Sequence, residues 1–208
     1  IAIMSRELMK HKRIMNYTTI WMDTLRGGET ELTNTNKLVR FYSGCTGLKT
    51  GTTSKAGCCL SATATRDNTS LLAVVLGSET SEDRFESAKA MLNWGFANYS
   101  TVTPQIDQSL ITNVAVLYGV ENYLTPVLPE TSPVLIEKGN ESKMPQSVEI
   151  PLNVEAPVEK GQVVGKVILK LGDETVGEYL LTSDREIPRL TFSIAIKRIL
   201  SAFSVKNS

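Results

Sequence analysis

The sequence of 208 residues contains a single histidine, His11, and only three cysteines, Cys45, Cys58 and Cys59. Adjacent cysteines rarely pair with each other, and no Cys-x-x-Cys or histidine-rich spacing is present. His11 lies in a basic stretch and is expected to be a solvated surface residue. The sequence therefore predicts no disulfide framework, no metal and no cofactor, and it leaves the redox compartment open.

The sequence also lacks any apolar run of 18 or more residues, the length that a membrane-spanning helix needs. It begins at Ile1 with neither an initiator methionine nor a signal peptide. Apolar residues at helical spacing follow at once, without an N-cap residue before them. We therefore expect the start of the chain to be cut rather than natural.

The net charge is zero, but the charges are unevenly distributed. Residues 1–98 have a net charge of +3, residues 99–188 of −7, and residues 189–208 of +4. An acidic middle followed by a wholly basic tail predicts separate units, and it gives no support to nucleic-acid binding.

Periodicity predicts a mixed first part. Residues 3–16 have the pattern of an amphipathic helix, and Tyr17–Asp23 has that of a strand. Three strands are expected at 46–52, 58–65 and 70–77, and their short connections favour antiparallel pairing. A helix should then begin at a Thr80–Asp83 capping box, with a stripe of residues packed against the sheet rather than binding a ligand. The stripe comprises Phe85, Ala88, Leu92, Phe96 and Tyr99.

The second part has short alternating runs and many prolines between residues 113 and 184, which predict a small all-β sandwich or barrel. Gln162–Leu171 and Thr175–Thr182 are expected to form a hairpin. The last twenty residues have the pattern of a basic amphipathic helix, which favours a membrane surface as the partner of residues 190–204. Docking of this helix on the β region or on a partner is the alternative.

One short stretch carries recognisable chemistry: Lys49-Thr50-Gly51-Thr52-Thr53 on an expected edge strand. A cation and a hydroxyl, Lys49 and Thr50, suit the carboxylate of a peptide. Gly51 leaves room for a substrate against the strand. The backbone N–H of Thr52 suits an oxyanion. A Ser-x-x-Lys or Ser-x-Asn motif, which would supply the nucleophile, occurs nowhere in the sequence.

In its longer context, Gly47–Gly57, this stretch resembles the third motif of the low-molecular-weight penicillin-binding proteins, the D-alanyl-D-alanine carboxypeptidases. The loop Leu32–Leu38 resembles their Asn-x-Asn loop. Downstream, Ala73–Gly77, Arg84-Phe85 and Ala88–Phe96 resemble the same family, and Ala156–Gly165 is similar to part of its C-terminal β domain. The resemblance covers nearly the whole chain in the family's order.

The resemblance implies an α+β fold in three parts. Residues 1–99 would be the C-terminal portion of a β-lactamase-like transpeptidase domain, with an antiparallel sheet and helices. Residues 100–188 would be a small all-β domain, and residues 189–208 an amphipathic helix, a possible membrane anchor.

The resemblance also implies a serine-type carboxypeptidase that removes the terminal D-alanine of peptidoglycan stem peptides through an acyl-serine intermediate. Its partners would be the stem peptide, β-lactams and a missing N-terminal half bearing the nucleophilic serine. Its location would be extracytoplasmic and peripheral, on the outer face of the bacterial cytoplasmic membrane. The substrate-binding residues would be Lys49, Thr50, Gly51, Thr52 and Thr53, with Lys49 and the Thr52 backbone acting in catalysis.

The chain departs from the family pattern at two positions of this motif. Thr46 stands where many members have an aspartate, and Thr52 stands where some have a histidine. Because Thr52 would act through its backbone N–H, that change should tune activity rather than abolish it. Some members also have an arginine near Ser78, which is absent here and leaves Lys49 and Thr50 as the carboxylate ligands.

Two other functions stay open at the level of the sequence. The missing nucleophile and the large β fraction would also suit a non-catalytic cell-wall or partner-binding β module with a transpeptidase remnant. The Lys160-Gly161-Gln162-Val163 turn also occurs in lipoyl- and biotin-carrier barrels. The predicted hairpin tip, Leu171–Glu174, lacks the lysine that such a carrier needs.

Overall fold

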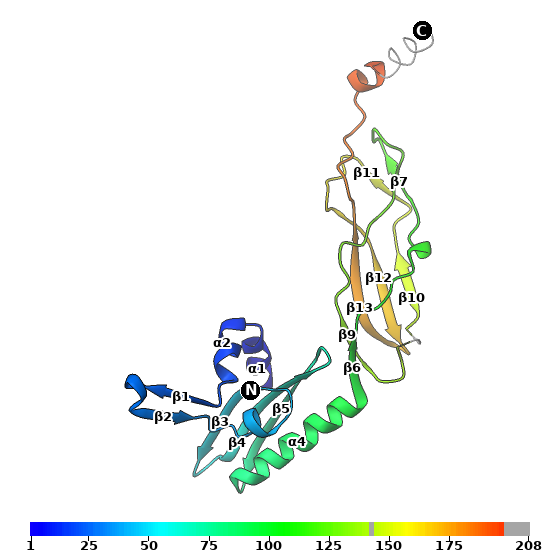
Figure 1. Cartoon of the computed structure of the whole chain (residues 1–208). Coiled ribbons are helices and arrows are strands. Elements are labelled where there is room, and N and C mark those ends of the chain that lie inside the picture. The colour runs from blue at the N-terminus through cyan, green and yellow to red at the C-terminus, as the bar shows by residue number, and fades with distance from the viewer. Residues whose placement is uncertain (142–143, 198–208) are drawn as a thin grey trace. The chain divides into compact units, whose positions relative to one another are not determined.

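The computed structural model describes residues 1–141 and 144–197 and divides the chain into two compact units. Unit 1 consists of Ile1–Thr101 together with Leu135–Lys138. Unit 2 takes up Val102–Val134 and the described chain from Gly139 onward. The fold is mixed α+β, with antiparallel sheets and few helices (Figure 1).

The centre of unit 1 is a three-stranded antiparallel sheet in the order β3-β4-β5. Its strands are β3 (Cys45–Thr53), β4 (Gly57–Arg66) and β5 (Thr69–Ser78), as the alternating pattern predicts. The turn from β4 to β5 places Asp67 and Asn68 at positive φ, which suits the tight hairpin turns of adjacent strands.

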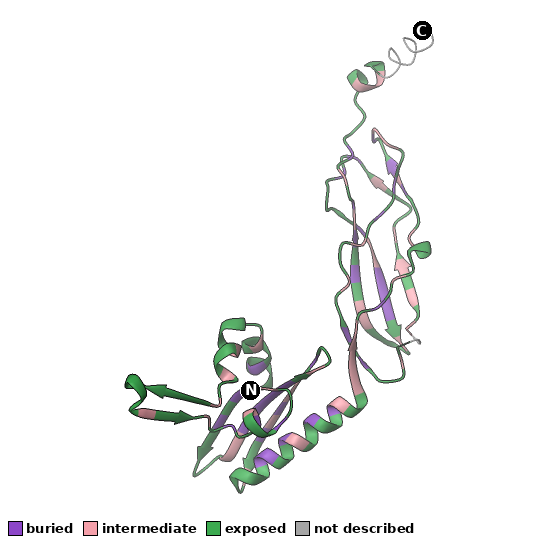
Figure 2. Ribbon diagram, viewed as in Figure 1, coloured by how far each residue is buried: buried purple, intermediate pink, exposed green. Residues whose placement is uncertain are grey.

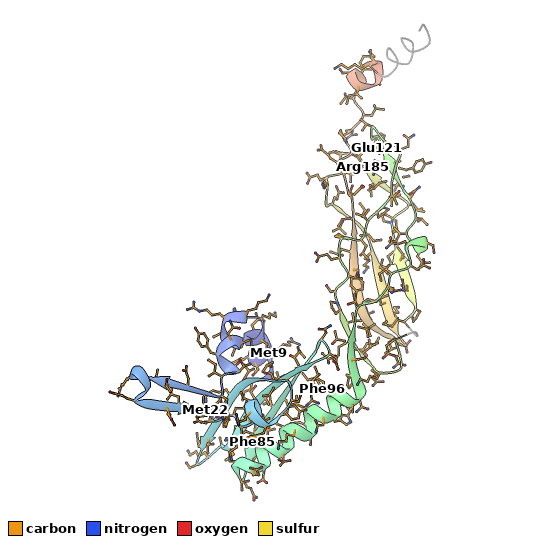
Figure 3. All side chains as sticks on the ribbon, viewed as in Figure 1. Met9, Met22, Phe85, Phe96, Glu121 and Arg185 are labelled. Carbon is orange, nitrogen blue, oxygen red and sulfur yellow. The ribbon has the colours of Figure 1, made fainter. Side chains whose placement is uncertain are left out.

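Helix α4 (Ser81–Asn98) covers one face of this sheet (Figure 1). The predicted capping box is confirmed, since the Thr80 hydroxyl accepts from the Asp83 N–H and the Asp83 carboxylate accepts from the Thr80 N–H. Buried positions recur along the side of α4 that faces the sheet, and Phe85 and Phe96 both project from this helix (Figures 2 and 3). The buried core under the helix contains Leu60, Ala62, Ala64, Ala73, Val75, Phe85, Ala88 and Leu92.

The opposite face of the sheet is contacted by two short helices, α1 (Ala2–Met9) and α2 (Lys12–Thr18). The single helix predicted over 3–16 is therefore interrupted after Met9. The strand predicted at Tyr17–Asp23 is confirmed only at Met22 and Asp23, which begin β1 (Met22–Leu25), because Tyr17 and Thr18 end α2. The Thr18 hydroxyl donates to the carbonyl of Thr46 at 2.7 Å, and this tertiary bond fixes a helical end where local propensity favours a strand.

Three smaller elements complete this part. A hairpin of β1 (Met22–Leu25) and β2 (Thr30–Thr33) is joined by the 3₁₀ turn η1 (Arg26–Gly28). Helix α3 (Leu38–Phe41) follows the polar loop and buries Leu38 in the core. After α4, β6 (Tyr99–Val102) pairs with β9 (Val134–Glu137).

Unit 2 contains two three-stranded sheets. One has the order β10-β12-β13 and is antiparallel, and its predicted hairpin is confirmed. Its strands are β10 (Gln146–Glu149), β12 (Val163–Leu171) and β13 (Glu174–Thr182). The other has the order β11-β7-β8, and β11 runs parallel to β7. Its strands are β7 (Val114–Leu117), β8 (Tyr123–Leu124) and β11 (Asn153–Glu155), and a 3₁₀ turn, η2 (Gln108–Leu110), precedes them.

A second buried core holds unit 2 together, and its members are Val116, Leu124, Ala156, Val158, Val164 and Ile187. Of the predicted basic tail helix, residues 198–208 lie outside the described residues. Among the helices of residues 1–141 and 144–197, none is both long and apolar enough to cross a bilayer.

Candidate functional site

The predicted motif lies on β3, which is an edge strand of its sheet. One side of β3 is hydrogen-bonded to β4 along most of its length, from Cys45 to Thr53. In the described part of the chain, no strand is paired with the other side. An unpaired edge can accept an extended peptide as an additional strand, which makes this edge the natural place for a peptide substrate.

Successive side chains of a strand point to opposite faces, so β3 divides the motif in two. Lys49 is exposed and lies opposite Ser61, whose hydroxyl is 2.7 Å from that of Ser5 in α1. Thr50 lies opposite Leu60, which is buried in the core beneath α4. Lys49 therefore belongs to the face of the sheet that α1 contacts, and Thr50 to the face that α4 covers.

The exposed ammonium of Lys49 donates a hydrogen bond to the carbonyl of Thr50 at 2.5 Å. The Thr50 hydroxyl is 2.6 Å from that of Thr35, and the Thr50 residue is only 7% exposed. The structure thus places the Lys49 ammonium beside the Thr50 backbone, whereas the Thr50 hydroxyl lies on the other face of the strand. It also engages the Thr50 hydroxyl with Thr35, a neighbour that the sequence does not reveal.

Thr35 is held in place by the asparagines on each side of it. The Asn34 carboxamide donates to the carbonyl of Ile20 at 2.9 Å and accepts from the N–H of Asn36 at 2.9 Å. Asn36 is 1% exposed and accepts from the N–H of Leu38 at 3.2 Å. Side chains that bond to nearby backbone groups fix a loop. This loop holds Thr35 beside the motif.

Gly51 has open space where a side chain would be. No atom lies within 4 Å of the position that a Cβ would occupy. Its φ is not in the left-handed region, so the backbone itself does not require glycine. The absence of a side chain at Gly51 therefore leaves room beside the strand rather than relieving strain, as a closely approaching substrate requires.

Thr52 and Thr53 have different surroundings. The Thr52 hydroxyl accepts from Arg84 at 3.1 Å and lies 3.8 Å from the sulfur of Cys58, to which it donates. The Thr53 hydroxyl accepts from the N–H of Ala56 at 2.9 Å and so stabilises the turn from β3 to β4. Thr53 therefore has a structural role in this turn, whereas Thr52 connects the motif to α4.

Arg84, in the first turn of α4, belongs to the site, although the sequence indicated it only as part of the family resemblance and gave it no role. It is 6% exposed, and its guanidinium donates to the carbonyls of Gly51 and Cys59 and to the Thr52 hydroxyl at 3.1–3.4 Å. A second nitrogen donates to the Ser81 hydroxyl at 3.0 Å. Among the described residues, every hydrogen bond of Arg84 goes to an uncharged oxygen, and its Nε has no partner.

The position of Arg84 in its helix is the signal that could have revealed it. A cation in the first turn of a helix opposes the helix dipole, which favours acidic residues there. The first turn of α4 also contains Glu82 and Asp83, which fit the dipole. An arginine at such a point needs another reason, and its hydrogen bonds to β3 provide one.

The three cysteines are free thiols around this sheet. Cys58 and Cys59 lie on β4 opposite Thr52 and Gly51. Burial raises the pKa of the Cys45 thiol, and a backbone hydrogen bond with Gly47 lowers it by less. The thiolate is the reactive form, so Cys45 is a poor nucleophile at neutral pH.

Comparison with known proteins gives two family matches. Residues 1–80 match the family described as D-alanyl-D-alanine carboxypeptidase. Residues 99–189 match the family described as penicillin-binding protein 5, C-terminal domain.

Individual relatives agree with these matches. The chain is 30% identical to the D-alanyl-D-alanine carboxypeptidase DacF of Bacillus subtilis (strain 168), over 96% of this chain and 52% of that protein. It is 34% identical to DacC of Escherichia coli (strain K12), over 62% of this chain and 33% of that protein. The chain thus spans about half the length, or less, of these relatives.

A solved structure extends the similarity to three dimensions. Penicillin-binding protein 5 from Haemophilus influenzae superposes with a TM-score of 0.75 at 29% identity. The match covers 90% of this chain and 55% of that one.

Proposed function

Because this chain belongs to the D-alanyl-D-alanine carboxypeptidase family, we propose that it forms the substrate-carboxylate side of a serine carboxypeptidase active site. The substrate is a peptidoglycan stem peptide that ends in two D-alanines. A serine from a Ser-x-x-Lys motif, which this sequence does not contain, attacks the carbonyl carbon of the last peptide bond. The terminal D-alanine leaves as the free amino acid, and water then hydrolyses the acyl-serine ester.

The observation that carries this proposal is the open edge of β3 beside Gly51. The peptide adds to this edge as a strand, through main-chain hydrogen bonds. The space at Gly51 lets the peptide lie against β3 without meeting a side chain. In this position the terminal carboxylate lies near Lys49 and Thr50.

Two cations favour a carboxylate at this position. The ammonium of Lys49 is exposed on one face of β3, and the guanidinium of Arg84 is buried against Gly51 and Thr52 from the other. Neither forms a salt bridge with a described carboxylate. The exposed Lys49 ammonium is therefore open to direct contact with an incoming anion, whereas the buried Arg84 contributes its positive charge from within the protein. Charge-assisted hydrogen bonds of this kind are stronger than neutral ones.

The Thr52 N–H is the proposed donor to the oxyanion that develops on the attacked carbonyl. A backbone donor of this type needs a fixed strand. The hydrogen bonds from Arg84 to the Gly51 carbonyl and the Thr52 hydroxyl fix this part of β3 from the face that α4 covers. We therefore assign Arg84 as a positioning residue for the site.

β-Lactams are the proposed inhibitors, since they present a carboxylate and a reactive carbonyl in a similar arrangement. They acylate the same serine, and the ester persists. Labelled penicillin thus gives a direct test. This chain alone should not become acylated, whereas the chain joined to a Ser-x-x-Lys-bearing N-terminal half should.

In the joined protein, Lys49→Ala should slow acylation by at least about tenfold, because a charge-assisted hydrogen bond contributes about 1.5–3 kcal/mol. Lys55→Ala, which removes an exposed lysine from the adjacent turn, is the matched control and should acylate at the original rate. Equal rates for Lys49→Ala and the unsubstituted protein would refute the assignment of Lys49. Absence of acylation in a folded joined protein would favour the non-catalytic cell-wall module.

We also propose the domain limits and the location. Residues 1–99 are the catalytic portion, residues 100–188 the β domain, and residues 189–208 a helix that binds the outer face of the cytoplasmic membrane. The absence of acidic residues after Glu186 supports the last assignment. Vesicle flotation of the chain with and without residues 189–208 tests it, and equal flotation would count against it.

A further inference from the structure

In unit 2, the turn between β7 and β8 contains Tyr118, whose ring is exposed and whose backbone is strained. Tyr118 has a φ of +60°, and its residue is 61% exposed. The left-handed region is unfavourable for a bulky side chain, and such strain persists only where the surrounding structure maintains it. Burial of the ring does not compensate for this strain, which favours a functional role for the exposed ring.

The surrounding structure ties this turn to the segment that leads into the basic tail. The N–H of Leu190 donates to the Tyr118 carbonyl at 2.7 Å, and the N–H of Val120 donates to the Pro188 carbonyl at 2.9 Å. The guanidinium carbon of Arg189 lies 5.3 Å from the centre of the Tyr118 ring, within the range of a cation–π contact. The ring, the cation and the start of the tail therefore share one rigid framework.

Exposed apolar residues gather around this framework. We define the tip patch as Leu117, Tyr118, Arg189, Leu190 and Phe192. The four apolar members are 38%, 61%, 42% and 82% exposed in that order. Phe192 in particular makes little contact with the rest of the unit.

The charge around the tip patch favours an anionic partner. Nearby Glu121 and Asp184 both bind the guanidinium of Arg185, at 2.8 and 3.0 Å, and Glu121 and Arg185 lie side by side in Figure 3. The sequence after Glu186 contains four basic and no acidic residues. Glu121 and Asp184 are thus neutralised by Arg185, whereas Glu155, which lies opposite Leu117, and Glu186 form no ion pair with a described residue. The positive charge at this end therefore comes from Arg189 and the adjacent tail.

We propose that the tip patch inserts into the head-group region of an anionic lipid bilayer. Tyrosine and phenylalanine with an adjacent arginine are typical of membrane interfaces, where the ring lies among the head groups and the cation contacts phosphate. A specific protein interface buries about 800 Å² on each side, which is more than five side chains provide. This inference rests on the proposed membrane location and adds a folded contact point to the tail.

Tryptophan fluorescence in vesicles with brominated acyl chains tests the contact directly. In the full chain, Tyr118→Trp should be quenched by phosphatidylglycerol vesicles of this type. Tyr17→Trp, at a 65% exposed tyrosine of unit 1, is the matched control and should not be quenched beyond the native background of Trp21 and Trp94. Flotation of both variants with no quenching at position 118 would mean that only the tail binds, which overturns the inference but not the proposed location.

A second variant separates binding from folding. Tyr118→Asn suits the left-handed backbone better than tyrosine, so the fold should be retained or become more stable. Its partition onto phosphatidylglycerol vesicles should nevertheless fall by about five- to tenfold, because an apolar ring no longer enters the interface. Tyr17→Asn should leave partition unchanged. Equal losses in the two variants, or none at position 118, would overturn the inference. Neither measurement depends on acylation by penicillin.

Discussion

The guanidinium of Arg84 lies 3.1 Å from the hydroxyl of Thr52, although 32 positions separate the two residues in the sequence. Through this bond and its bond to the Gly51 carbonyl, the first turn of α4 supports the strand that carries the motif. Helix α4 therefore stabilises the edge strand β3. The geometry of this strand depends on Arg84, which a substrate does not need to contact.

Replacement of Arg84 should affect both stability and acylation. Arg84→Met leaves the Gly51 and Cys59 carbonyls without this donor, so the free energy of unfolding should fall by about 1–3 kcal/mol. Urea unfolding measures this change. Lys89→Met, which removes only an exposed ion pair on the same helix, should lower it by less than about 1 kcal/mol.

In the joined protein, Arg84→Met should also slow acylation by penicillin more than Lys89→Met does. If the two variants acylate at the same rate, Arg84 has no part in positioning the site.

The pair of hydroxyls at Thr35 and Thr50 allows a double-mutant cycle. Thr35→Val and Thr50→Val should each lower the free energy of unfolding by about 1 kcal/mol, and the double variant should lose less than the sum because the two share one hydrogen bond. Only Thr50→Val should slow acylation. Similar slowing by Thr35→Val would mean that the loop, rather than the Thr50 hydroxyl, recognises the substrate.

Gly51→Ala should separate folding from binding. A Cβ at this position meets nothing within 4 Å, so stability should stay the same or rise by up to about 1 kcal/mol. Acylation should fall, because the methyl group occupies the space proposed for the peptide.

Gly95→Ala provides the contrasting case on α4. Its Cβ would lie 2.6 Å from a methyl carbon of Leu71, which must shift, so this cost should offset the gain of about 1 kcal/mol that alanine has over glycine in a helix. Unchanged acylation in Gly51→Ala would argue that the substrate does not approach this part of β3.

The three thiols should differ in their reaction with a disulfide reagent such as dithionitrobenzoate. Burial raises the pKa of Cys45, so its thiolate is scarce at neutral pH and the thiol should react slowly. The rate should increase as the pH rises toward the raised pKa. The slow phase should disappear in Cys45→Ala, and its persistence there would assign the slow thiol to another cysteine.

The same shift has a defined effect on stability. The folded state favours the neutral thiol of Cys45, so this contribution is fully present below the pKa of the unfolded thiol. It is lost as the pH rises through the higher folded pKa. The free energy of unfolding should therefore fall less steeply at alkaline pH in Cys45→Ala than in the unsubstituted chain.

Local patterns were sufficient to predict the central sheet and its helix. Alternation located β3, β4 and β5, the Asp67-Asn68 pair located a turn, and the capping box located the start of α4. These signals succeed because each depends on residues that are close in the sequence. The same period-two rule explains why Lys49 and Thr50 lie on opposite faces of β3.

The failures depend on contacts between distant residues. Thr18 ends a helix because its hydroxyl bonds to Thr46, 28 positions away, and its side chain lies close to Gly47. Likewise, the structure has two helices, α1 and α2, with a break after Met9, although the helical spacing of apolar residues continues through this point in the sequence. The role of Arg84 arises from acceptors 25 to 33 positions earlier in the chain, and no local pattern reveals which acceptors those are.

The Thr80–Asp83 capping box fixes where α4 begins and therefore which residues of β3 Arg84 can reach. Under the proposed function, substitutions in this capping box would alter sensitivity to β-lactams without changing any atom proposed to contact the drug. Substitutions at Thr80 or Asp83 would destabilise the first turn of α4 and weaken the hydrogen bonds from Arg84 to β3. The affinity for an inhibitor bound at this strand would then change. Surveys of resistant strains that sequence only the motif would overlook such substitutions.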